Sequence, residues 1–315
     1  MDTYAVVGSG YMGGGIAQML ALSGARVKIA DVDAETARRS HERLVTEARD
    51  FERDGLFPAG AADTIAANIT PAESIETAVR DASFIEEAVP ERIDIKHDIL
   101  RRISAACPQE AVIGSNTSTI LIEKLATAVH HPERFVGVHF SNPAPFIPGV
   151  EVIPHPGTAE SAIVTAERVV AMTGKQPARV KDSTGFVLNR LQYALFHEAS
   201  QIVEEGIATA EDVDTIVRTT FGMRLPFFGP FAVADMAGLD VYALCYTSLQ
   251  TRWPERFATP RSLQEHVEAG RFGTKTGAGY LDIPSERIAA LVEYRNRAYV
   301  EVQQLLERLG PPPIS

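Results

Sequence analysis

A glycine-rich turn near the start of the chain constrains the fold more than any other part of the sequence. The apolar run Tyr4–Val7 leads directly into Gly8-Ser9-Gly10-Tyr11-Met12-Gly13, and an apolar helix is expected from there to about Ser23. Gly8 permits the tight turn, Gly10 lets a pyrophosphate approach the backbone, and Gly13 lets the helix pack closely on the strand. This order predicts a dinucleotide-binding unit with the phosphates at the helix N-terminus. The residues expected to contact the dinucleotide are Gly8, Gly10, Tyr11, Met12 and Gly13.

An acidic residue at the end of the second expected strand specifies the dinucleotide. Val27-Lys28-Ile29-Ala30 ends in Asp31, at about the distance from the glycines that suits a carboxylate bonding the adenosine ribose hydroxyls. Val32 and Asp33 follow where an arginine would favour a ribose 2′-phosphate, so such a phosphate would be repelled. The sequence therefore predicts NAD rather than NADP as cofactor.

A histidine and a glutamate in the middle of the chain suit proton transfer. Val136-Gly137-Val138-His139 is expected to be a buried strand that ends in the histidine, where open α/β sheets bind their ligands. Val150-Glu151-Val152-Ile153 is expected to be the next strand. A buried carboxylate that holds one ring nitrogen of a histidine fixes its tautomer and stabilises its charged form, so His139 is a candidate general base oriented by Glu151.

Composition narrows the class of protein. The 315 residues, 45% hydrophobic and 23% charged, are enough for two domains with sizeable cores. The formal charge of −11 argues against nucleic acid or an anionic membrane as partner. Cys107 and Cys245 lie far apart and outside any metal-ligand spacing, so we expect neither disulfides nor a metal site. With neither a membrane-spanning run nor a signal-peptide pattern, a cytoplasmic location is expected.

The pattern of elements predicts an α/β protein with two parts. Strand and helix signals alternate to about Val180, as in the doubly wound parallel sheet of a Rossmann domain, and the rest looks helical. We expect the NAD-binding domain over 1–184, with a helical insertion at about 34–68, and an all-α domain over 185–315. The expected strands are 3–7, 26–31, 83–88, 111–114, 135–140, 150–154 and 176–180.

Several motifs occur together and in order: Gly8–Gly13, Ser115-Asn116-Thr117-Ser118, His139-Phe140-Ser141-Asn142-Pro143, Thr184–Arg190, Asp235–Asp240 and Gly273–Tyr280. Together they resemble the 3-hydroxyacyl-CoA dehydrogenase family over almost the whole chain. The resemblance implies a Rossmann domain, a helical domain that carries a homodimer interface, and a small-molecule substrate bound between them.

The resemblance also implies roles for individual residues. His139 matches the catalytic base and Glu151 its orienting carboxylate, while Ser118 matches a serine that touches substrate and nicotinamide. Asn189 matches the asparagine near the reacting oxygen. The matches to cofactor-contacting positions are Asn142, Glu91 and Lys96. Two simpler interpretations stay open, because Ser118 could cap a helix beginning near Leu121 and Asn189 could lie on a solvated helix face.

The substrate is the least determined feature. Members of the family that use CoA thioesters carry serine and lysine on the helical insertion, and Glu47 and Asp54 occupy the corresponding positions here. Arg49 or Arg53 could still bind the CoA phosphates. Pro145–Gly149 and Ile153–Pro156 resemble the branch that contains lambda-crystallin and L-gulonate 3-dehydrogenase, whose members oxidise free hydroxy acids.

The function expected from the sequence is NAD-dependent oxidation of a 3-hydroxyacyl substrate to the 3-oxo compound, with a short 3-hydroxyacyl-CoA of fatty acid metabolism as the leading substrate. The alternative is a dehydrogenase of a free small hydroxy acid, of the L-gulonate, carnitine or pyridoxine-degradation type. A more distant alternative is an NAD-binding structural protein without catalysis, which an intact pair of His139 and Glu151 argues against.

Overall fold

The chain forms two compact units in a computed structural model that describes residues 2–310. The units are residues 1–195 and 196–315, and the division falls within one helix. The domain boundary expected after residue 184 stays a prediction. Among residues 2–310, no helix combines the length and the apolar character needed to cross a membrane.

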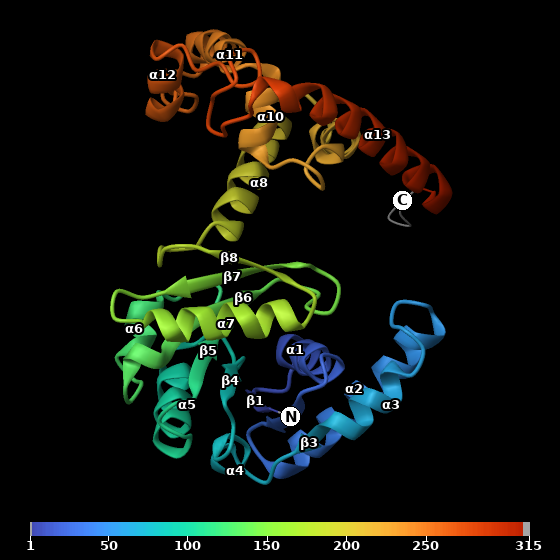
Figure 1. Ribbon diagram of the computed structural model, residues 1–315, viewed down its shortest axis with the longest axis vertical. Coiled ribbons are helices and arrows are strands. Elements are labelled where there is room, and N and C mark those ends of the chain that lie inside the picture. The colour runs from blue at the N-terminus through green and yellow to red at the C-terminus, as the bar shows by residue number, and fades with distance from the viewer. Residues whose placement is uncertain (1, 311–315) are drawn as a thin grey trace. The chain divides into compact units, whose positions relative to one another are not determined.

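The first unit is built on one eight-stranded sheet, with strand order β3-β2-β1-β4-β5-β6-β7-β8 (Figure 1). Adjacent strands run parallel except β6 and β7, which pair antiparallel. The Rossmann-type α/β fold expected from the sequence is therefore confirmed. The strands are β1 (Thr3–Val7), β2 (Arg26–Ala30), β3 (Ile69–Pro71), β4 (Phe84–Glu87), β5 (Val112–Ser115), β6 (Phe135–Phe140), β7 (Gly149–Pro154) and β8 (Gln176–Arg179).

Two features of the sheet differ from the expectation. The expectation that all strands run parallel is wrong for β7. The connection after Phe140 is too short for the crossover that a parallel partner of β6 would need. The strand β3 was not expected, since it is three residues long, ends in Pro71 and lies at the edge of the sheet. Proline is tolerated at sheet edges, but it weakens the strand pattern in a sequence.

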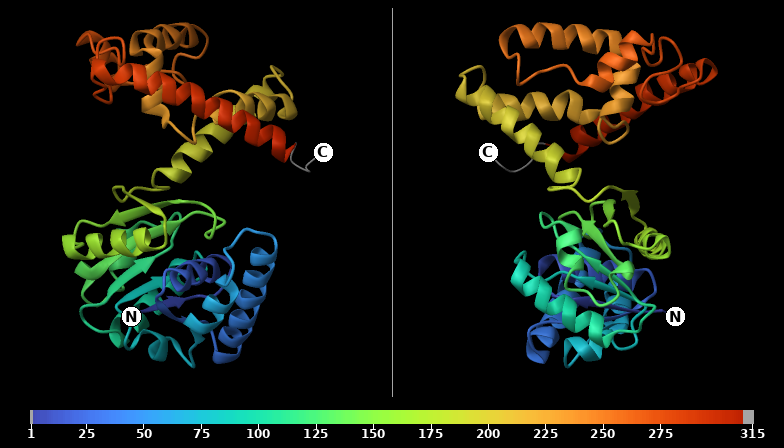
Figure 2. Two further views of the ribbon diagram at one scale, coloured as in Figure 1. Left: turned by 45° about the vertical axis from the view of Figure 1, so that its right-hand side comes forward. Right: turned by 90° about the vertical axis from the view of Figure 1, so that its left-hand side faces the viewer.

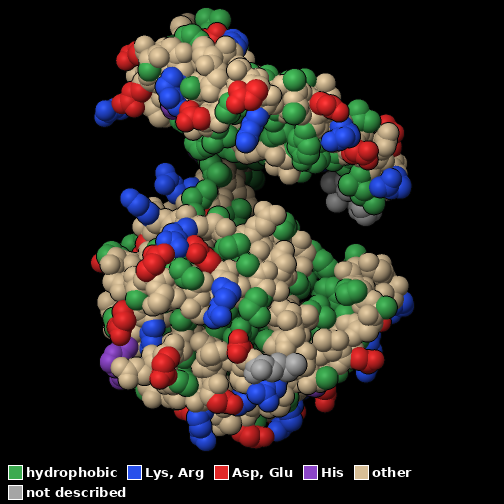
Figure 3. All heavy atoms as spheres, in the orientation of Figure 1, with side chains coloured by type: hydrophobic (Ala, Val, Ile, Leu, Met, Phe, Trp, Pro, Cys, Tyr) green, Lys and Arg blue, Asp and Glu red, His purple; other side chains and the backbone are tan. Residues whose placement is uncertain are grey.

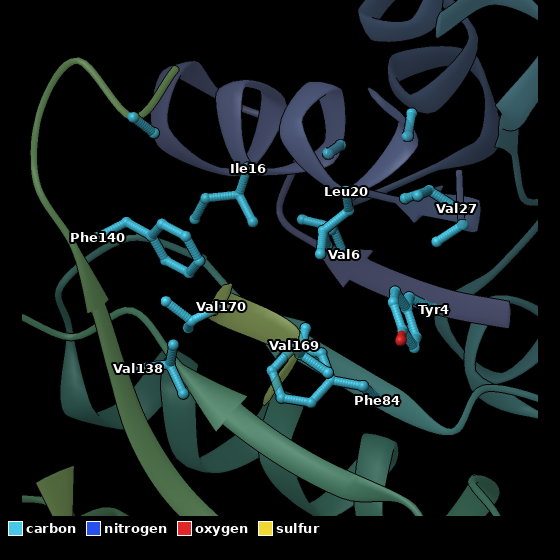
Figure 4. Close-up of a cluster of buried hydrophobic side chains, with 14 of the residues drawn as sticks. Tyr4, Val6, Ile16, Leu20, Val27, Phe84, Val138, Phe140, Val169 and Val170 are labelled. Carbon is cyan, nitrogen blue, oxygen red and sulfur yellow. The ribbon is translucent and has the colours of Figure 1, made fainter. Parts of the chain in front are cut away.

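Helices cover both faces of this sheet and build two apolar cores. Buried side chains of α1, α2, α3 and α7 pack on one face, and those of α4, α5 and α6 pack on the other. Figure 4 shows Ile16 and Leu20 of α1 pointing into the core, where Leu20 lies beside Val6 of β1 and Ile16 lies nearer to Phe140 of β6. The helices are α1 (Tyr11–Leu22), α2 (Ala34–Arg53), α3 (Ala61–Asn68), α4 (Ile75–Val79), α5 (Ile93–Ala106), α6 (Ile122–Ala126), the 3-10 turn η1 (Pro132–Arg134) and α7 (Glu160–Met172).

The insertion after β2 has the form that the sequence predicts. It consists of α2 and α3, with a break that includes Gly55, in the left-handed conformation at φ 73°, and Pro58. Both helices run side by side in the two views of Figure 2. Asp33 caps the start of α2 by accepting a hydrogen bond from Thr36 N–H at 2.7 Å.

The second unit is helical, as expected, with a small core that includes Ala234, Leu239 and Leu263. Thr209 caps α9 by accepting a hydrogen bond from Asp212 N–H at 3.1 Å. Hydrophobic side chains stay exposed on this unit, and Figure 3 shows them (green) beside α13. The elements are α8 (Leu188–Glu204), which begins in the first unit, α9 (Ala210–Thr219), η2 (Phe221–Met223), α10 (Pro230–Ala237), α11 (Leu239–Arg252), α12 (Arg261–Glu268) and α13 (Ser285–Leu309).

Candidate active site

The glycine-rich turn joins β1 to α1 with the geometry that a dinucleotide requires. Gly8 has φ +95°, and a Cβ there would lie 2.6 Å from the Ala88 carbonyl oxygen, so only glycine fits. A Cβ on Gly13 would collide with the Gly8 carbonyl oxygen. Within the described residues 2–310, no atom lies within 4 Å of a Cβ built on Gly10, so these residues leave the N-terminus of α1 open at that point. This open, positively polarised helix end fits a pyrophosphate.

Asp31 lies directly beside this turn at the end of β2. Its carboxylate accepts hydrogen bonds from Ser9 N–H at 2.8 Å, from the Ser9 hydroxyl at 2.6 Å and from Val32 N–H at 2.8 Å. Arg43 of α2 holds the other side of the turn by donating to the Ser9 carbonyl at 2.8 Å. The structure thus brings Asp31 to the glycine motif, and its role in binding ribose stays a prediction.

His139 and Glu151 face each other across the antiparallel pair β6 and β7. His139 Nδ1 lies 2.8 Å from Glu151 Oε2, and both residues are buried. The other oxygen of Glu151 accepts hydrogen bonds from Val187 N–H at 2.8 Å and Leu188 N–H at 3.0 Å, at the start of α8. A carboxylate so placed accepts a hydrogen bond from Nδ1–H and leaves Nε2 as the basic nitrogen.

The charge of Glu151 is stabilised in the folded protein. Burial raises the pKa of Glu151, but the hydrogen bonds from His139, Leu188 and Val187 outweigh burial and hold the pKa below its ordinary value. Glu151 is therefore ionised at neutral pH. The ionised carboxylate lies 2.8 Å from Nδ1, so the positive charge that forms when His139 accepts a proton is paired.

Ser118 lies in a loop that is held from two sides. Its N–H donates to Glu91 Oε1 at 2.9 Å, and its carbonyl accepts a hydrogen bond from Asn189 Nδ2 at 3.0 Å. The helix cap that Ser118 could have supplied comes from Asp182, which accepts from Ile122 N–H and Glu123 N–H at the start of α6. Both simpler interpretations are wrong, because Ser118 does not cap α6 and the Asn189 side chain turns to the Ser118 loop.

A buried ion pair lies beneath this loop. Lys96 is 1% exposed and its ammonium lies 2.8 Å from Glu87 Oε1, 3.2 Å from the Val89 carbonyl and 3.5 Å from Glu91 Oε2. Glu87 also accepts a hydrogen bond from the Ser115 hydroxyl at 2.6 Å. Sequence reasoning found Glu91 and Lys96 but missed Glu87, because nothing near this last residue of β4 in the sequence indicates which group pairs with it.

Several of the expected residues line a single pocket of about 500 Å³ in the first unit. The expected residues on its wall are Ser118, His139, Asn142, Asn189 and Met12. Three other expected residues do not line it: Glu151 contacts His139, Glu91 contacts the Ser118 backbone, and Lys96 contacts Glu91. Residues that the sequence analysis did not single out also line it: Asn116, Phe140, Ser141, Ile147, Leu188 and Gln192. Asn116 could have been found, since it follows β5 within the same motif as Ser118, and its Oδ1 accepts Phe140 N–H at 2.8 Å.

Two family models match the chain consecutively. Residues 3–183 match the NAD binding domain of 3-hydroxyacyl-CoA dehydrogenase, and residues 185–283 match its C-terminal domain. The chain belongs to the 3-hydroxyacyl-CoA dehydrogenase family. It is an NAD-dependent dehydrogenase, and the NAD cofactor predicted from Gly8–Gly13 and Asp31 is confirmed at the level of the family.

Relatives within the 3-hydroxyacyl-CoA dehydrogenase family differ in the substrates that they are named for. The 5-formyl-3-hydroxy-2-methylpyridine 4-carboxylate 5-dehydrogenase of Mesorhizobium japonicum is 36% identical over 305 residues, covering 96% of this chain and 97% of the relative. The 3-hydroxyadipyl-CoA dehydrogenase of Escherichia coli is 32% identical, covering 92% of this chain and 61% of the relative. Among solved structures, a 3-hydroxyacyl-CoA dehydrogenase of Archaeoglobus fulgidus matches with a TM-score of 0.81 at 28% identity, covering 98% and 99% of the two chains.

Proposed function

We propose that this dehydrogenase oxidises a secondary alcohol at the third carbon from a carboxyl or thioester carbonyl, with His139 as general base. The buried pair of His139 and Glu151 on the wall of the pocket supports this assignment. His139 Nε2 takes the hydroxyl proton, and Glu151 stabilises the imidazolium that forms. Bound at the Gly8–Gly13 turn, NAD would supply the acceptor for the hydride that leaves the carbinol carbon as the C=O bond forms. Ser118 and Asn189 bind the reacting oxygen.

For the substrate, we propose a free small carboxylic acid rather than a CoA thioester. The observation that carries this choice is the surface of α2, where acids neutralise the arginines. Arg43 pairs with Glu47 at 2.7 Å, and Arg53 pairs with Asp50 at 2.6 Å and with Asp54 at 3.2 Å. A nucleotide phosphate placed here would have to displace these carboxylates, which makes α2 a poor phosphate site.

The second candidate is a short 3-hydroxyacyl-CoA of fatty acid metabolism. Arg49 is exposed on α2 and supports this alternative, since a single guanidinium can bind a phosphate bidentately. The relatives divide in the same way, because the name of the Mesorhizobium japonicum relative contains a pyridine carboxylate and that of the Escherichia coli relative a CoA thioester.

A panel of substrates separates the two candidates. NADH absorbance is followed at saturating NAD with 3-hydroxybutyryl-CoA, free 3-hydroxybutyrate, gulonate, carnitine and an aromatic hydroxymethyl acid, and the His139→Ala variant serves as the control without a base. Turnover of free 3-hydroxybutyrate, gulonate or carnitine and not of the thioester supports our proposal. Turnover of the aromatic hydroxymethyl acid alone, which is a primary alcohol, would contradict the proposed secondary alcohol. Turnover of the thioester alone overturns it in favour of the CoA substrate, and the Arg49→Ala variant then tests the phosphate contact.

We further propose that the protein forms a homodimer through its helical unit. Large apolar side chains remain exposed there, including Phe196, Ile207, Leu244 and Leu309 at 61% to 71% exposure. Single exposed residues are common, but this number in one small unit is typical of a surface that another chain covers. Light scattering during size-exclusion chromatography tests the proposal, and a monomeric mass at micromolar concentration would contradict it. The cytoplasmic location expected from the sequence stays a prediction.

A further inference from the structure

Three charged side chains form a connected group beneath the Ser118 loop: Glu87 on β4, Glu91 after it and Lys96 on α5. Glu87 and Lys96 are almost completely buried, and Glu91 is about one-third exposed. Two carboxylates and one ammonium leave the group with one net negative charge. Because the group lies mostly out of the solvent, salt screens this charge less than it screens a charge on the surface.

Glu91 is the member of this group that contacts a residue of the pocket wall. Its Oε1 accepts the Thr117 hydroxyl at 2.7 Å, Ser118 N–H at 2.9 Å and Thr119 N–H at 2.8 Å. Burial raises the pKa of Glu91, but these hydrogen bonds and the charge of Lys96 hold the pKa below its ordinary value. An ionised carboxylate is therefore fixed one hydrogen bond away from the backbone of a residue on the pocket wall.

The two forms of the cofactor differ in charge at the place where hydride is transferred. The oxidised nicotinamide ring carries a positive charge, and the reduced ring is neutral. Hydride transfer requires the ring to lie in the pocket beside the alcohol that His139 deprotonates. A fixed negative charge behind Ser118 attracts the oxidised ring and has little effect on the reduced one.

We propose that the Glu87, Lys96 and Glu91 group discriminates between the redox states of the cofactor, raising affinity for NAD⁺ relative to NADH. Lys96 has a positioning role in this group, since its buried ammonium holds the two carboxylates and does not reach the solvent. The proposal rests on the placement of Ser118 beside the nicotinamide, and it is independent of the substrate class.

The test is the ratio of the dissociation constants for NAD⁺ and NADH. NADH is titrated by its fluorescence and NAD⁺ by competition, with no substrate present, for the protein and for its Glu91→Gln variant. The amide of Gln keeps an oxygen that can accept the bonds from Thr117, Ser118 and Thr119, so the substitution removes the charge and with it the ion pair with Lys96 at 3.5 Å. For a charge roughly 10 Å from the ring, we expect NAD⁺ to bind about three- to tenfold more weakly relative to NADH.

The matched control is Glu110→Gln, which changes the net charge equally at an exposed position before β5, at the opposite end of the strand from Ser118. The proposal predicts an unchanged ratio for this variant. An unchanged ratio in Glu91→Gln, equal weakening of both forms, or the same shift in Glu110→Gln overturns it. If Glu91→Gln does not fold, Glu87→Gln decides by the same measurement, since it removes the same charge. Both dissociation constants are measured without substrate. The substrate panel tests the proposed function, so either proposal can fail without the other.

Discussion

Replacing Glu151 with Gln should remove most of the catalysis while leaving cofactor binding intact. Glu151 serves three donors with two oxygens, namely His139 Nδ1–H, Val187 N–H and Leu188 N–H. A Gln amide has only one accepting oxygen. If this oxygen stays with the two backbone N–H groups, the amide NH₂ faces His139 and forces its Nδ1 to accept. The histidine proton then lies on Nε2, and the base is lost.

The second possible orientation of the Gln side chain keeps the histidine tautomer but lowers the stability of the fold. If its oxygen turns to His139, the N–H groups of Val187 and Leu188 lose a buried acceptor, at about 1–3 kcal/mol of folding free energy for an unsatisfied group. The first orientation is therefore expected to dominate. General base catalysis is worth about 10²–10⁴-fold, so we expect kcat to fall by at least 100-fold, which corresponds to about 3 kcal/mol of transition-state stabilisation.

Stopped-flow measurement of NADH formation gives kcat, and NADH fluorescence titration gives cofactor affinity in the same preparation. The control is Glu133→Gln, which changes an exposed pair with His131 at 3.5 Å and should leave kcat unchanged. A Glu151→Gln variant that retains kcat within about tenfold of the starting protein would refute the role of Glu151 in setting the tautomer. So would a loss of kcat that is matched by an equal loss of NAD affinity.

Three further predictions concern the cofactor site and the core. Asp31→Ala should weaken NAD binding about tenfold or more, as expected for hydrogen bonds to a charged group; unchanged affinity in calorimetry would contradict the ribose role. Gly13→Ala should prevent native packing of α1, because its Cβ overlaps the Gly8 carbonyl oxygen; a normal melting temperature and normal NAD binding would argue against this. Glu86 is fully buried, and within residues 2–310 neither carboxylate oxygen has a hydrogen-bond partner. Burial and the charge of Glu87 raise its pKa well above the ordinary 4.5. The folded state thus keeps a proton that the unfolded chain releases, and stability falls by about 1.4 kcal/mol per pH unit from the ordinary pKa up to the folded-state pKa. Glu86→Leu should remove this loss, so urea unfolding should show a larger gain at pH 8 than at pH 5, and equal gains would disprove it.

Much of the cofactor site was predictable because its determinants are local. The requirement for glycine at Gly8 and Gly13 comes from contacts between adjacent elements of one strand-turn-helix unit. The apolar runs around His139 and Glu151 likewise predicted that both residues lie on buried strands. Their chemistry suggested the pair, and the antiparallel register of β6 and β7 brings them to 2.8 Å.

Other parts of the site depend on residues that are far apart in the chain. Glu87 is bonded to Ser115, Asn189 to Ser118, and Asp182 to the start of α6. Nothing near a buried acid in the sequence tells which distant cation or hydroxyl will satisfy it. For this reason Glu87 was missed, and Ser118 was open to interpretation as a helix cap.

The sequence by itself determined the Rossmann-type unit, the NAD cofactor and the identity of the candidate base, since each depends on steric or periodic patterns within a short segment. Only the tertiary structure decided that β7 runs antiparallel, that Asp182 caps α6, and that Lys96 is buried between Glu87 and Glu91. The physical reason is that charge pairing and strand direction depend on which distant segments meet, and that is settled by the packing of the whole unit.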